Sequence, residues 1–69
     1  MKSIFDIRQL LKNYGTYIYI GDRIADLELM EDELKELYQS QMIDLKQYQM
    51  AKLLLRQEIA KEMDKLNKK

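Results

Sequence analysis

Apolar residues recur at intervals of three or four along most of this chain, which is the spacing of one helical face. The first such run predicts a helix over about residues 3–14, with an apolar face of Ile4, Ile7, Leu10, Leu11 and Tyr14. Ser3 and Asp6 can cap its first turn as a short capping box. Gly15 stands where a left-handed residue commonly ends a helix.

The period changes to two between residues 16 and 20, where Tyr17 and Tyr19 alternate with Ile18 and Ile20. Such alternation is typical of extended backbone, because successive side chains of a strand point to opposite sides. The sequence contains no second run of this kind that could pair with it. We therefore predict an extended linker here and no sheet.

Two longer helices are predicted after the linker. The second runs from about residue 22 to 41, with Asp22 as its cap and an apolar face of Ile24, Leu27, Met30, Leu34, Leu37 and Tyr38. The third runs over about residues 44–65, with Asp44 and Gln47 as a capping box and a face of Tyr48, Ala51, Leu55, Ile59, Met63 and Leu66. Three amphipathic helices with short connections predict an all-α domain over residues 1–69, a small antiparallel three-helix bundle.

Charge is segregated along a chain whose net charge is zero. Residues 22–36 carry seven acidic against two basic side chains, whereas residues 46–69 carry seven basic against three acidic ones. There is no cysteine and no histidine, which removes disulfides, thiolate metal sites and the commonest general base. We expect no enzymatic activity, no metal or other cofactor and no small-molecule substrate. No apolar run is long enough for a membrane span, so a cytoplasmic protein without membrane contact is expected.

Aromatic and basic residues cluster in the first third of the chain. Flat rings beside cations are what a single-stranded nucleic acid requires, because the rings stack on bases and the cations bind phosphates. The candidates for such a site are Phe5, Arg8, Lys12, Tyr14, Tyr17, Tyr19 and Arg23, with Lys52 and Arg56 as weaker additions. For Phe5 a place in the core is the favoured alternative, because the only phenylalanine of a small protein is usually needed inside. For the two linker tyrosines, an equal alternative is that one covers the end of the bundle while the other is half-exposed.

Two further surface patterns have ordinary explanations. Lys46, Lys61, Lys65 and Lys68 fall on one side of the third helix, as a solubilising face does. Apolar Leu29, Met50 and Leu54 lie outside the main stripes and indicate either simple packing or an interaction surface. The second reading gives the alternative function, a protein-interaction module that forms a homodimer.

The run from Tyr14 to Ser40, which begins Tyr-Gly-Thr-Tyr-Ile-Tyr-Ile-Gly-Asp-Arg, resembles the YqgQ family of short bacterial cytoplasmic proteins. The similarity extends from Ile4 past Arg56. The resemblance implies a three-helix bundle and binding of single-stranded nucleic acid, and it implies no reaction and no cofactor. Our interpretation of the sequence is therefore a binder of single-stranded RNA or DNA with little sequence preference.

Overall fold

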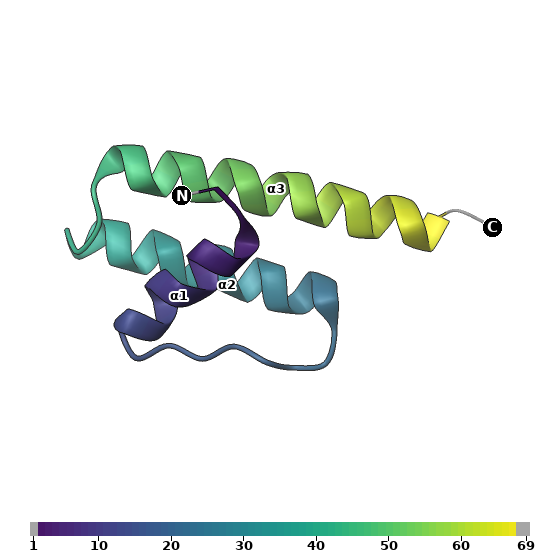
Figure 1. Ribbon diagram of the computed structural model, residues 1–69, viewed down its shortest axis with the longest axis horizontal. Coiled ribbons are helices and arrows are strands. Elements are labelled where there is room, and N and C mark those ends of the chain that lie inside the picture. Colours follow the sequence, from purple (N-terminus) through teal and green to yellow (C-terminus); the bar gives the residue numbers. More distant parts are fainter. Residues whose placement is uncertain (1, 68–69) are drawn as a thin grey trace.

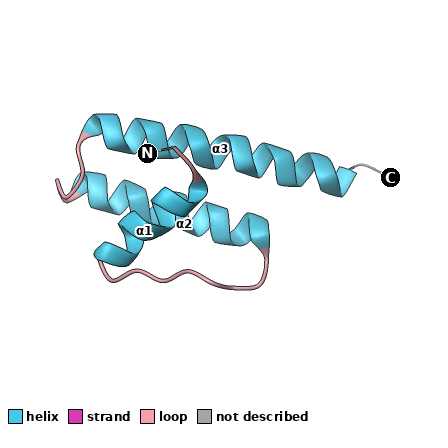
Figure 2. Ribbon diagram, in the orientation of Figure 1, coloured by secondary structure: helices cyan, strands magenta, loops and turns pink. Residues whose placement is uncertain are grey.

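The computed structural model describes residues 2–67, which form three helices and no strand (Figures 1 and 2). The helices are α1 (Ile4–Asn13), α2 (Arg23–Gln39) and α3 (Leu45–Asn67). The predicted all-α three-helix fold is confirmed, and the predicted bounds agree with the observed ones to within two residues. Lys68, the last member of the predicted lysine face, lies outside the described residues.

The long helices α2 and α3 run antiparallel, and α1 lies obliquely across them (Figure 1). A linker of residues 14–22 joins α1 to α2 and runs back along the outside of the molecule. As a result, α1 and α2 run in a similar direction in this view. All three helices contribute to one core, whose buried apolar residues are Ile7, Leu11, Leu27, Met30, Leu34, Ile43, Ala51 and Leu55. The predicted apolar faces therefore meet as expected.

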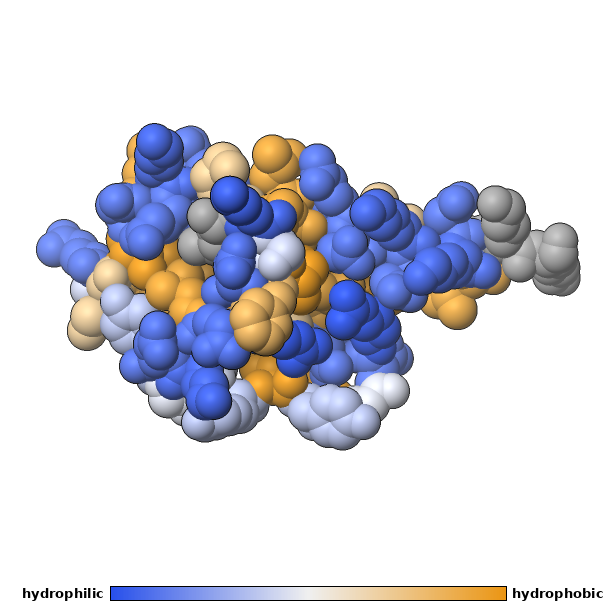
Figure 3. All heavy atoms as spheres, in the orientation of Figure 1, coloured by the Kyte–Doolittle hydropathy of each residue, from blue (hydrophilic) through white to orange (hydrophobic). Residues whose placement is uncertain are grey.

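The predicted face of α3 is only partly covered. Its last two members, Met63 and Leu66, are exposed because α3 continues past the ends of α1 and α2 (Figure 1). On the face drawn in Figure 3, hydrophobic residues show between α1 and α3, and the projecting end of α3 is mostly hydrophilic. In residues 2–67, none of the helices has the length and apolar character that crossing a bilayer takes.

The helix starts are capped as the sequence predicts. Asp22 accepts hydrogen bonds from the backbone N–H groups of Ile24 and Ala25 at 3.0 and 3.2 Å. Asp44 and Gln47 bond each other's backbone N–H, as a capping box requires. These contacts use N–H groups that helix starts otherwise leave unpaired.

Both α1 and α2 are followed by a residue in the left-handed conformation. Gly15 follows α1 with φ 82°. Its N–H donates to the Lys12 carbonyl, and the N–H of Thr16 donates to the Leu11 carbonyl. This pair of hydrogen bonds is a Schellman motif. Gln41 takes the same place after α2 with φ 63°. A side chain makes this conformation unfavourable, so the second motif is strained where the first is not.

This difference predicts that Gln41→Gly stabilises the protein. The expected gain in the free energy of unfolding is about 0.5–1 kcal/mol. The variant removes the cost of a left-handed residue with a side chain, and it adds the smaller cost of ordering a more flexible glycine. Urea unfolding followed by circular dichroism measures it. The converse change, Gly15→Ala, should lower stability by about 1 kcal/mol, since nothing lies near the added Cβ and the cost is that of φ alone. A destabilised Gln41→Gly variant would contradict the assignment.

Candidate nucleic-acid interface

The linker contains an extended segment, residues 16–20, that two side chains hold against the helices. Arg8 of α1 donates from Nη1 to the Ile18 carbonyl at 3.3 Å. Asp26 of α2 accepts from the Ile20 N–H through Oδ1 at 2.8 Å. Ile18 also packs its side chain against the core. Polar contacts and one apolar anchor therefore fix a segment that has no strand partner in residues 2–67.

Tyr17 and Tyr19 flank Ile18 in extended backbone, so their side chains point opposite to the Ile18 side chain, which packs against the core. They are 76% and 87% exposed, so neither ring packs against the end of the bundle. An exposed tyrosine ring contributes no buried apolar surface to the core. Both of its faces remain accessible for stacking. The alternation predicted from the sequence is correct for Tyr17, Ile18 and Tyr19, whereas Ile20 is exposed although the alternation predicts that it lies on the side of Ile18.

Beside the extended segment lies a groove of about 400 Å³, here called the tyrosine groove. It is lined by Arg8, Gln9, Leu11, Lys12, Thr16, Tyr17, Ile18, Tyr19 and Met30. Among the described residues no carboxylate forms an ion pair with Arg8 or Lys12. Arg8 uses one of its five N–H donors on the Ile18 carbonyl, which leaves the others available to an anion. Four of the predicted site residues thus share one hollow.

The prediction that Phe5 packs in the core is wrong. The residue is 65% exposed and lies outside the core. Residues two apart on a helix are turned by about 200° from each other, and the short α1 buries the face that carries Ile7. Phe5 consequently lies off the buried face of α1. It lines a different hollow, together with Arg23 and Glu58, and does not reach the tyrosine groove.

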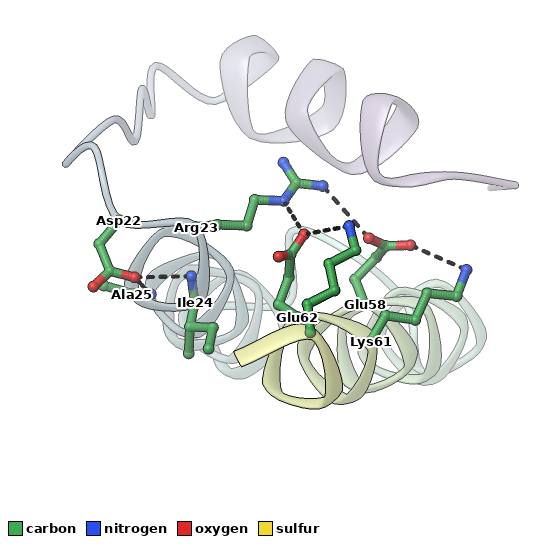
Figure 4. Close-up of polar contacts among 8 residues, drawn as sticks. Asp22, Arg23, Ile24, Ala25, Glu58, Lys61 and Glu62 are labelled. Carbon is green, nitrogen blue, oxygen red and sulfur yellow. Dashed lines mark hydrogen bonds and ion pairs between the residues drawn. The ribbon is translucent and has the colours of Figure 1, made fainter. Parts of the chain in front are cut away.

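Arg23 lies at the start of α2 and is paired with acids of α3 (Figure 4). Its Nη2 is 3.5 Å from Glu58 and its Nε is 3.6 Å from Glu62. Lys61 and Lys65 extend the same cluster by one ion pair each. A phosphate at Arg23 would have to approach both carboxylates. Arg23 also does not line the tyrosine groove, whereas Arg8 and Lys12 do.

The two weaker candidates are also engaged elsewhere. Arg56 of α3 makes a two-pronged contact with Glu31 of α2 at 2.8 and 3.3 Å. The Lys52 ammonium lies 5.9 Å from the centre of the Tyr48 ring, which itself stacks on Tyr38. Neither cation lines the tyrosine groove.

Tyr14, the first residue of the linker, has a structural role. Its hydroxyl donates to the Met42 carbonyl at 2.9 Å, which ties the end of α1 to the turn between α2 and α3.

The three apolar residues predicted for a protein-interaction surface differ in their exposure. Leu29 and Met50 are exposed, but Leu54 packs partly buried against the core.

Asp26 is the site residue that sequence reasoning missed. Its side chain is almost fully buried, with 4% of the residue exposed, although it lies in an acidic stretch that suggests a solvated surface. One signal was present: Asp26 precedes Met30 by four residues and so shares its buried face. An acid on an apolar helical face needs a hydrogen-bond donor, and the linker supplies it.

These features define a class of protein, a small three-helix domain that displays two tyrosines on an anchored extended linker. Residues 1–61 match the family described as YqgQ-like. The protein YqgQ of Bacillus subtilis (strain 168) is 46% identical over 59 residues, which are 86% of this chain and 83% of that protein. The chain belongs to the YqgQ-like family. The match brings no activity, ligand or partner with it.

The anchoring role of Asp26 can be tested. Asp26→Ala leaves the Ile20 N–H without its acceptor, and we expect a loss of about 1–3 kcal/mol in the free energy of unfolding. Amide hydrogen exchange should accelerate at Ile20 in particular. Asp26→Asn keeps an acceptor oxygen and should lose less, so equal losses in both variants would contradict the hydrogen-bond account.

Proposed function

We propose that this protein binds single-stranded nucleic acid weakly and with little sequence preference, through the tyrosine groove. The observation that carries the proposal is the pair of rings, Tyr17 and Tyr19, standing in water next to two cations without carboxylate partners in residues 2–67. Aromatic rings stack on any base, since every base has a π-face, and this explains the lack of preference.

The arrangement gives each residue a role. Tyr17 and Tyr19 would stack on neighbouring bases, and Arg8 and Lys12 would contact the phosphates that follow the groove. Arg8 is held in place by the Ile18 carbonyl, so less order has to be imposed on its side chain when a phosphate binds. Phe5, Tyr14, Arg23, Lys52 and Arg56, which the sequence also nominates, are left out of the proposed interface because they lie outside the groove.

Single strands are favoured over duplexes for two reasons. Bases in a duplex are stacked on each other and cannot accept the tyrosine rings. The acidic residues of α2 would also repel the broader phosphate surface of a duplex, whereas a single strand can follow the basic side alone.

Titration of a labelled single-stranded oligonucleotide tests the proposal. Tyr17→Ala and Tyr19→Ala should each weaken binding by about 1–3 kcal/mol. Phe5→Ala is the matched control, because it removes another largely exposed ring that lies outside the groove, and it should leave the affinity unchanged. Equal losses in all three variants would show that the groove is not the site.

The cations give a second test. Two phosphate contacts predict a slope of about −1.4 for log affinity against log salt on a single strand. Lys12→Ala should reduce this slope by about 0.7, whereas Arg56→Ala should not change it, since Glu31 already neutralises that guanidinium. Binding that is absent at low salt, or that is insensitive to Lys12→Ala, would overturn the proposal.

A further inference from the structure

The two edges of the extended segment differ in their hydrogen bonding. In extended backbone the N–H and C=O of one residue point to the same edge, and those of the next residue point to the other edge. The inner edge carries the Ile18 carbonyl and the Ile20 N–H, which bond Arg8 and Asp26. The outer edge therefore carries the N–H and C=O groups of Tyr17 and Tyr19.

This outer edge is open. Within residues 2–67, none of the hydrogen bonds involves the backbone groups of Tyr17 or Tyr19. The linker runs along the outside of the molecule, with no helix beyond it (Figure 2). Of the large apolar and aromatic side chains that the structure describes, those of Tyr19 and Tyr17 are the most exposed. In the described chain, these backbone groups therefore have no hydrogen-bond partner.

The sequence of the segment favours strand pairing. Thr-Tyr-Ile-Tyr-Ile consists entirely of β-branched and aromatic residues, the types enriched in strands. It has no charge and no proline, which are the usual devices that prevent an exposed edge from pairing with another chain. Gly15 and Gly21, both at positive φ, turn the chain away at either end and limit any pairing to this segment.

We infer that the outer edge of residues 16–20 pairs with the same edge of a second copy of this chain, as an antiparallel two-stranded ribbon. The segment is complementary to itself about a two-fold axis at Ile18. Tyr17 then lies opposite Tyr19 of the second copy, and each such pair exchanges both N–H···O=C bonds. The opposed residues are two tyrosines, a combination that stabilises antiparallel pairs.

This inference does not rest on nucleic acid binding, and it concerns a different surface from Leu29 and Met50. The contact is short, so we expect a weak dimer whose population rises with protein concentration. Hydrogen exchange gives the distinctive signature. From micromolar to millimolar protein, the amides of Tyr17 and Tyr19 should slow by at least about tenfold, while that of Ile18, on the inner edge, should not change.

A pair of variants separates the backbone edge from the rings. Tyr19→Pro removes the outer N–H and is compatible with extended backbone, so it should abolish concentration-dependent dimerisation in sedimentation equilibrium. Tyr19→Ala removes the ring and keeps the N–H, and should retain a dimer that is weakened but measurable. A chain that stays monomeric throughout, or a dimer that survives Tyr19→Pro unchanged, overturns the inference. So does exchange at Tyr17 and Tyr19 that is independent of concentration.

Discussion

Two hydrogen bonds along the inner edge of residues 16–20 determine where the tyrosine rings stand. Asp26 is buried between the linker and the core, and its carboxylate accepts the Ile20 N–H at 2.8 Å. Arg8 holds the Ile18 carbonyl from the other helix. A linker of this length would otherwise sample many conformations, and its ordering costs about 1–2 kcal/mol per residue in backbone entropy. The tyrosine groove exists because these contacts oppose that cost.

The fold could be predicted from the sequence because its signals are local. Ser3, Asp22 and Asp44 cap the three helices where their positions in the chain indicate. The buried residues of each helix follow from a spacing of three or four. The overhang of α3 could not be predicted, because the exposure of Leu66 depends on how far the other helices reach and not on its own periodicity.

The candidate site was less predictable, because it depends on which charges find partners across the bundle. Arg8 and Arg23 look alike in the sequence, and each is close to a tyrosine. Arg23 meets Glu58, which lies 35 residues away in the chain, whereas Arg8 meets a backbone carbonyl. Segregated charge therefore does not by itself make a basic surface here. Three acids of the long helices pair with a cation of the opposite helix: Glu58 and Glu62 with Arg23, and Glu31 with Arg56.

The two proposals concern the same tyrosines but different groups. Nucleic acid would contact their rings, and a second copy would pair with their backbone N–H and C=O groups. Backbone hydrogen bonds of an extended chain lie in the plane of pairing, and side chains stand out of that plane. Pairing of the outer edges would therefore leave the rings of Tyr17 and Tyr19 available on one face of the ribbon, with the rings of the second copy beside them. A strand that contacts both copies gains from effective concentration, because the second contact becomes intramolecular. Weak stacking in each copy would thus combine into tighter binding by the dimer, and nucleic acid would favour the dimer to the same extent.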